Sequence, residues 1–160
     1  MSQHPYNPLD SLVFLTNRVG RLLSSDIRKR AGDDVEGLYS THMGVLVDLW
    51  MQDGLRQHDL VISVVKDKGT IARALENLEK QDIVYRVTDA ADRRNKRIYL
   101  TPKGRKLKED MLPHALASVE EVLEGIPAEE VAICKKVLRR MYKRLVQKMM
   151  HTTPADTTSL

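Results

Sequence analysis

The sequence contains one cysteine, few aromatic residues and no long hydrophobic run. A single cysteine, Cys134, excludes an internal disulfide framework and fits a reducing cytoplasm, where we expect the protein to reside. No apolar segment approaches the roughly 20 residues that cross a bilayer, and the N-terminus has no signal-peptide pattern, so we expect no membrane partner. Because aromatic residues make up only 4% of the chain, the core must be built mainly from Leu, Val, Ile and Met.

Motifs of catalysis are also missing from the sequence. It has no Gly-rich phosphate loop, no nucleophile elbow and no Cys-x-x-Cys or His-x₃-His spacing, so we predict no enzyme, no cofactor and no metal site. What is present is typical of one soluble folded domain: 160 residues, of which 42% are hydrophobic and 30% are charged.

Positive charge is concentrated in one stretch of the chain. Between Arg86 and Lys108, nine basic residues face only Asp89 and Asp92, a net charge of +7, whereas the whole chain carries +4. A local excess of this kind is expected of a surface that binds phosphates. A solvated basic face with no ligand is the alternative.

The periodicity of apolar residues predicts mainly helix with one small β-hairpin. Helical patterns run from about residue 9 to 30, from 40 to 52, from 57 to 65, from 68 to 80, from 102 to 124 with a kink at Pro113, and along a last helix to about 150. Alternating residues from Ile83 to Thr88 and from Arg97 to Thr101 indicate two strands. The tail, residues 151–160, is predicted to be disordered.

Two short helices in the middle of the chain fit a helix-turn-helix. Asp67 is positioned to cap the second one, whose apolar stripe of Ile71, Ala74, Leu75 and Leu78 leaves a polar face exposed. A helix that enters the major groove of DNA needs polar side chains and close approach near its start. The candidate DNA contacts on this helix are Lys68, Gly69, Thr70, Arg73 and Asn77. An ordinary amphipathic surface helix is the alternative.

The hairpin that follows has a basic tip and therefore resembles a wing. Its candidate DNA contacts are Arg86, Asp92, Arg93, Arg94 and Lys96. Arginine is favoured in the narrow minor groove, where the negative potential is enhanced. We expect Asp92 to pair with Arg94 and to hold its guanidinium in one pose before DNA arrives, with about 0–1 kcal/mol of stabilisation.

Taken together, Asp67 to Lys80, the stretch Ile83-Val-Tyr-Arg86, the wing sequence Asp92-Arg-Arg94 and the segment Leu100-Thr-Pro-Lys-Gly104 resemble the signature of the MarR family of transcriptional regulators. The resemblance covers about residues 9–150. It implies a winged helix-turn-helix lobe (37–101) joined to a dimerisation layer built from the N-terminal (1–36) and C-terminal (102–150) helices. It also implies a homodimer on a pseudo-palindromic double-stranded operator, with Arg94 in the minor groove and Thr70 and Arg73 on the major-groove helix.

Three positions depart from the family pattern. Asp82 replaces a glycine after the recognition helix, Val65 and Lys66 replace a glycine-plus-apolar pair between the two short helices, and Tyr39 replaces a capping Ser or Thr. A non-glycine residue tolerates the left-handed backbone region poorly. We expect these departures to alter the local geometry of the turns and to leave the predicted fold unchanged.

Many family members release DNA when a phenolic or aromatic acid binds between the dimer layer and the DNA-binding lobe, which suggests that this protein is a repressor released by such an effector. The candidate lining residues are Arg18, Tyr39, His42, Met43 and Trp50. Met43 and Trp50 also fit a plain core, and Arg18 a surface charge. Two alternatives are redox sensing through Cys134 and metal sensing through His42 and His114. We expect Cys134 to be buried and inert on the last helix, and no metal-ligand spacing accompanies the two histidines.

A second class of function remains open from the sequence. The last helices could form a protein–protein interface in a helical adaptor with little DNA binding. A gel shift with an Arg94 variant separates the two readings.

Overall fold

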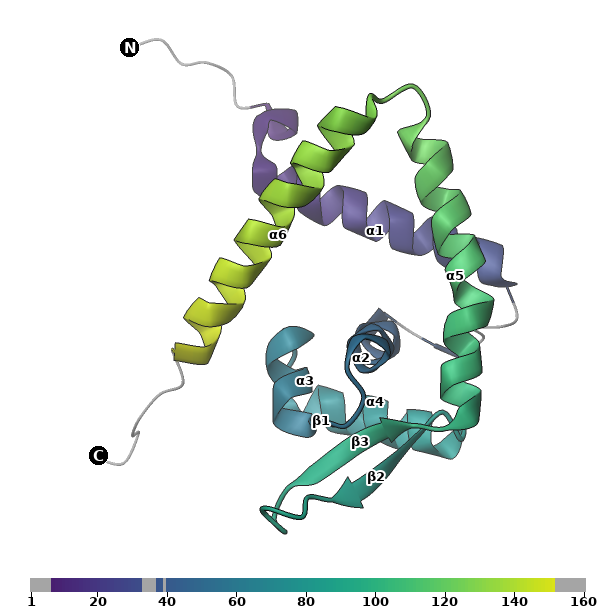
Figure 1. The fold of residues 1–160 in the computed structure, drawn as a ribbon, viewed down its shortest axis with the longest axis vertical. Coiled ribbons are helices and arrows are strands. Elements are labelled where there is room, and N and C mark those ends of the chain that lie inside the picture. The colour runs from purple at the N-terminus through teal and green to yellow at the C-terminus, as the bar shows by residue number, and fades with distance from the viewer. Residues whose placement is uncertain (1–6, 33–36, 39, 152–160) are drawn as a thin grey trace.

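The computed structural model describes residues 7–32, 37–38 and 40–151, and it divides into a frame of long helices and a central lobe (Figure 1). The helical frame consists of the 3₁₀ turn η1 (Pro8–Asp10), α1 (Leu12–Ala31), α5 (Pro102–Leu123) and α6 (Ala128–His151). The central lobe consists of α2 (Ser40–Met51), α3 (Gln57–Ser63), α4 (Lys68–Lys80) and the strands β1 (Leu55–Arg56), β2 (Val84–Thr88) and β3 (Lys96–Leu100). The predicted class, mainly helical with a hairpin in a winged helix-turn-helix, is confirmed.

The sheet has one strand more than the sequence predicts. β2 and β3 form the expected antiparallel hairpin, and β1 pairs with the other edge of β3 through Leu55 opposite Ile98 and Arg56 opposite Arg97, giving the order β1-β3-β2. Two residues are too few to show an alternating pattern, which is why β1 was missed. The third strand ties the base of the wing to the segment between α2 and α3.

The core of the molecule lies in the central lobe. The predicted stripe of α4 is buried, with Ile71, Leu75 and Leu78 fully inaccessible. Asp67 caps the helix as expected, its Oδ1 accepting a hydrogen bond from the Thr70 amide at 2.8 Å. Side chains of α2, α3, β2 and β3 make up most of the rest of this cluster, and Ala31 of α1 and Met111 of α5 join it from the frame. The hydrophobic core of the lobe is therefore closed within one chain.

A tight contact joins the lobe to the helical frame at the start of α5. Thr101 caps α5 by accepting from the Gly104 amide, and its hydroxyl donates to the Asp82 carbonyl at 2.6 Å. A Cβ at Gly104 would lie 2.2 Å from the backbone oxygen of Ile83. Only glycine therefore allows α5 to leave the sheet along this path.

The helical frame leaves much of its apolar surface uncovered in the single chain. The large hydrophobic residues on α1, α5 and α6 that are at least half exposed are Leu12, Val13, Leu22, Leu112, Leu116, Val122, Ile133, Tyr142 and Leu145. Cys134 is also exposed, so the expectation of a buried thiol is wrong. The physical reason is that most of α6 stands clear of the rest of the chain, and α3 is its principal neighbour in the lobe.

The boundaries of the predicted elements are otherwise close to those observed. α6 continues to His151, one residue into the predicted tail, and residues 152–160 lie outside the described residues, as does Tyr39.

No helix within the described ranges is both long and apolar enough to span a bilayer. Within the same ranges no three His, Cys, Asp or Glu side chains gather in a way that could hold a metal ion.

Candidate nucleic-acid interface

The first turn of α4 organises its polar side chains into a chain of hydrogen bonds. Thr70 donates its hydroxyl to Asp67 Oδ2 at 2.6 Å and accepts from Arg73 Nη2 at 3.2 Å. These bonds from Thr70 are the main reason why the pKa of Asp67 is lowered. Asp67 therefore caps the helix and also orients the two residues that the sequence places at the major groove.

The remaining candidates on α4 are accessible to a ligand. Lys68, Gly69, Arg73 and Asn77 are exposed, while Thr70 is half-buried. A Cβ at Gly69 would meet Asp67 Oδ1 at 3.3 Å, a close but adjustable contact. Internal packing alone therefore does not require a glycine at this position, and the space in front of it is open to solvent.

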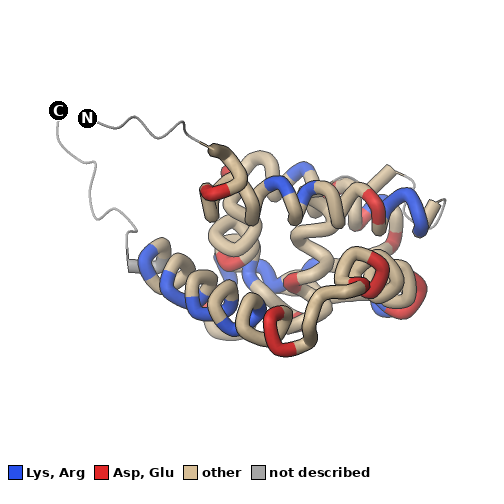
Figure 2. Tube along the Cα trace, turned by 90° about the horizontal axis from the view of Figure 1, so that it is seen from above, with Lys and Arg blue, Asp and Glu red and all other residues tan. Residues whose placement is uncertain are grey.

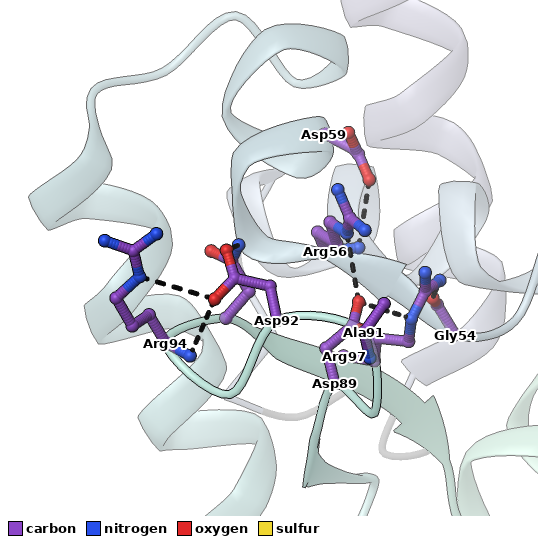
Figure 3. A network of polar contacts seen from close by, with 9 residues as sticks. Gly54, Arg56, Asp59, Asp89, Ala91, Asp92, Arg94 and Arg97 are labelled. Carbon is purple, nitrogen blue, oxygen red and sulfur yellow. Dashed lines mark hydrogen bonds and ion pairs between the residues drawn. The ribbon is translucent and has the colours of Figure 1, made fainter.

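At the wing tip, Asp92 holds the turn and the neighbouring arginine (Figure 3). Asp92 Oδ1 accepts from the backbone amide of Arg94 at 3.1 Å and lies 3.4 Å from its Nε, and Oδ2 accepts from Asn95 Nδ2 at 3.0 Å. The predicted Asp92–Arg94 pair is present. The Arg94 side chain is 93% exposed, so its guanidinium extends into solvent from a turn of defined shape.

The carboxylate of Asp89 stabilises the base of the wing. From the sequence alone, Asp89 was considered only as a negative charge within the basic stretch. Asp89 is almost fully buried, and its Oδ2 accepts from Arg56 Nε at 3.1 Å and from Arg97 Nε at 2.8 Å, while Oδ1 accepts from the Ala91 amide. The hydrogen bond from Ala91, followed by the two guanidinium groups, lowers the pKa of Asp89. Arg97 also donates to the Gly54 carbonyl at 2.9 Å.

This cluster joins the wing to a segment 33 residues earlier in the chain. Arg56 comes from β1, Asp89 directly follows β2, and Arg97 comes from β3. In the sequence, the only indication of this cluster was the acidic residue Asp89 directly after the first predicted strand. The cluster fixes the direction in which the wing leaves the sheet.

The other wing candidates fall into two groups. Arg93 and Lys96 are exposed at the tip. Arg86 is different: its Nη1 lies 3.4 Å from Glu79 of α4, its side chain is 24% exposed, and its Nε and Nη2 are buried without a partner among the described residues. The structure therefore places Arg86 between β2 and α4, where its charge is directed inward.

A cavity of about 530 Å³ lies between the helical frame and the central lobe. Its walls come from α1, α2, α3 and α5, and they include Met43 and Trp50 as the sequence predicts. Arg18 is not among the lining residues; its guanidinium lies 5.3 Å from the ring of Phe14 on α1. His42 is buried outside the lining, and burial lowers its pKa.

The charged residues of this cavity were missed in the sequence. Arg28 of α1, Lys108 of α5 and Asp48 of α2 line it. Lys108 Nζ donates to the Trp50 carbonyl at 3.2 Å, and Asp48 accepts from the hydroxyl of Ser63. No local pattern brings together side chains from helices separated by up to 80 residues, so only the fold reveals that two cations border one apolar space.

Comparison with known proteins supplies independent information on the lobe and the frame. Residues 38–96 match the model of the MarR family. The transcriptional regulator HosA of Escherichia coli O127:H6 is 33% identical over 99 residues, which are 62% of this chain and 67% of HosA.

Solved structures extend the similarity to the helical frame. CouR from Rhodococcus jostii RHA1 bound to p-coumaroyl-CoA is 26% identical with a TM-score of 0.71, covering 97% of this chain and 100% of CouR. BpsR from Bordetella bronchiseptica, whose DNA binding is regulated by 6-hydroxynicotinic acid, is 27% identical with a TM-score of 0.66, covering 79% of this chain and 95% of BpsR. The order and arrangement of both regions are thus shared with known regulators.

Proposed function

Because this chain belongs to the MarR family of transcriptional regulators, we propose that it is a homodimeric repressor that binds a pseudo-palindromic DNA operator and is released by a small aromatic acid. The observation that carries the proposal is the preformed wing tip, with Arg94 exposed and aligned by Asp92. An arginine held in this way enters a narrow minor groove with little loss of side-chain entropy.

The recognition helix supplies the second part of DNA binding. α4 would lie in the major groove, where Thr70 and Arg73, already linked to Asp67, face base edges or phosphates. Asn77 lies on the same exposed face, and Lys68 is exposed at the first position of the helix. Arg86 serves a different purpose in this proposal: its pairing with Glu79 sets the angle between α4 and the wing.

The uncovered apolar surface of the helical frame supports a homodimer. Leu22 of α1, Leu116 of α5 and Leu145 of α6 are each more than half exposed in the single chain. So many exposed apolar side chains on three helices are typical of a surface that is covered by a partner. We therefore assign residues 37–101 to DNA binding and residues 1–36 and 102–150 to dimerisation.

The cavity between frame and lobe supports control by an effector. Apolar walls with Met43 and Trp50 and two bordering cations, Arg28 and Lys108, suit an aromatic ring that carries a carboxylate. The aromatic ligands of CouR and BpsR are consistent with this class. Titration with hydroxybenzoic and hydroxycinnamic acids, followed by gel shift, tests it; weaker release in Lys108→Gln is expected, and no release by any acid contradicts it.

A gel shift on the protein's own promoter region tests the DNA mechanism. We expect Arg94→Ala to weaken specific binding by about 1–3 kcal/mol, because it removes a minor-groove contact. Lys96→Ala should instead weaken binding to all sequences equally and flatten its salt dependence by up to about 2 units, because a dimer loses two charges. Unchanged affinity of Arg94→Ala, with wild-type folding by circular dichroism, would favour the helical adaptor with little DNA binding.

A further inference from the structure

The last helix carries a second concentration of positive charge that the DNA-binding lobe does not account for. Beyond Glu129 and Glu130 in its first turn, α6 has no acidic residue and seven basic ones. All seven are exposed: Lys135, Lys136, Arg139, Arg140, Lys143, Arg144 and Lys148. Blue segments follow one another along this helix towards the C-terminus in Figure 2.

The spacing of these residues places most of them on one side of the helix. At about 100° per residue, the five residues Lys136, Arg139, Arg140, Lys143 and Arg144 lie opposite the apolar side formed by Leu138, Met141 and Leu145, and Lys135 and Lys148 lie at the two edges of this arc. From the first to the last basic residue the helix rises about 20 Å. We call this surface the α6 basic face.

Complementing the helix dipole does not require so many charges. That effect is confined to the last turn and contributes about 0.3–1 kcal/mol, whereas the α6 basic face extends over more than three turns. Within the described residues no ion pair involves Lys136, Arg140 or Lys143, and Arg139 donates only to the backbone of its own helix. Outside α6 and the stretch 86–108, the chain has ten basic and eighteen acidic residues. The net positive charge of the chain is therefore concentrated in α6 and in the stretch 86–108.

We propose that the α6 basic face binds the phosphate backbone of duplex DNA flanking the operator. The proposal rests on the function proposed above, in which the apolar side of α6 is covered by the second copy and the basic side stays outside. α6 also contacts α3 of the DNA-binding lobe and extends to its level in Figure 1. DNA held by the lobe is thus present at high effective concentration near this face.

The composition of the face favours duplex DNA over an acidic protein. Its polar residues between 135 and 146 are all Lys or Arg, apart from Tyr142 on the apolar side, so it offers charge without amide or hydroxyl groups for specific pairing. Lys and Arg contacts to phosphates position a protein on DNA and read no sequence. The face therefore increases affinity for long DNA of any flanking sequence.

The experiment compares two lengths of duplex at several salt concentrations. A 24-base-pair duplex contains only the operator mapped by footprinting on the protein's own promoter region, and a 60-base-pair duplex adds flanking DNA of arbitrary sequence. The variant is Arg140→Gln/Lys143→Gln, and the control is Arg21→Gln/Lys29→Gln, which removes one exposed Arg and one exposed Lys from α1. Circular dichroism and gel filtration verify folding and oligomeric state.

We expect the wild type to bind the long duplex more tightly than the short one, with a steeper dependence on salt. The α6 variant should keep wild-type affinity for the short duplex and lose most of the gain from length. Two charges per subunit correspond to a salt slope flatter by up to about 4 units in a dimer. The α1 control should behave as the wild type on both duplexes.

Three results would overturn the proposal. The first is that the wild type binds both lengths equally, and the second is that the α6 variant loses affinity for both lengths equally. The third is that the wild type binds anionic phospholipid vesicles and the α6 variant does not, while the α6 variant still binds the long duplex more tightly than the short one. Failure of the wild type to bind the short duplex would instead contradict the proposed function. In that case a 60-base-pair duplex of random sequence tests the α6 basic face alone. The proposal then requires that the α6 variant bind this duplex more weakly than the wild type does.

Discussion

The central lobe and the helical frame bury their apolar residues to very different extents. Leu46, Leu75 and Leu78 of the lobe are fully inaccessible, whereas Leu116 and Leu145 of the frame are more than half exposed. The lobe is therefore a unit whose stability is decided within one chain. The frame is a surface whose stability depends on what covers it, and this difference supports the proposal that the frame is the region of assembly.

The largest test of this contrast is Leu75→Ala in the lobe. Removing a fully buried leucine side chain should lower the free energy of unfolding by about 2–5 kcal/mol, because apolar contacts are lost and a cavity remains. Urea denaturation followed by circular dichroism measures it. A loss below about 1 kcal/mol would show that the lobe has no closed core of its own.

The matched change in the frame is Leu145→Ala. In the dimer we expect the dissociation constant to rise at least about tenfold, since apolar area is lost from both copies of the interface. Sedimentation equilibrium at several concentrations measures it, and Lys136→Ala on the opposite side of α6 is the control. If both variants dissociate equally, the apolar side of α6 is not the interface.

A smaller effect concerns strain in the turn between α3 and α4. Val65 has φ 54°, a region that β-branched residues rarely adopt, and its side chain is 66% exposed. Val65→Gly should stabilise the lobe by about 1 kcal/mol, because the strain of the left-handed conformation exceeds the gain in chain entropy of the unfolded state. Thermal unfolding monitors the change. Val65→Asn should show part of it, and destabilisation by both variants would contradict the explanation.

The smallest effect is a pH dependence in the wing. The lowered pKa of Asp89 means that its contribution to stability is fully present above its usual value of 3.8 and is lost as the pH falls through the lower pKa of the folded protein. Asp89→Asn should abolish this part of the acid destabilisation. Amide exchange in β2 and β3 as a function of pH measures it, and Asp67, whose pKa is also lowered, continues to titrate in both proteins. An identical pH profile in the variant excludes Asp89 as the source.

Two departures from the family pattern lie where the backbone is left-handed. Asp82 and Val65 both have positive φ, at 57° and 54°. The sequence alone showed that glycine is missing at these two positions. It did not show that the backbone would still adopt the left-handed conformation there, which costs free energy in a residue other than glycine. The surrounding hydrogen bonds explain why: the Asp82 amide donates to Glu79 and its carbonyl accepts from Thr101.

Local features of the fold and of the candidate site were thus predictable from the sequence. The stripe of α4, the cap at Asp67, the hairpin and the Asp92–Arg94 pair each depend on residues within a few positions of one another. Helix and strand periodicity and capping are properties of neighbouring residues, so their signals are present in the linear order.

Features that join distant segments were decided only by the tertiary structure. The strand β1, the Arg56–Asp89–Arg97 cluster, the inward direction of Arg86, the cations Arg28 and Lys108 at one cavity, and the exposure of Cys134 all belong to this group. Each depends on which elements meet, and that is set by the packing of the whole lobe against the frame. The sequence by itself determined a winged helix with a basic wing; packing decided how the wing is held and which charges face outward, because burial and pairing are properties of contacts rather than of order along the chain.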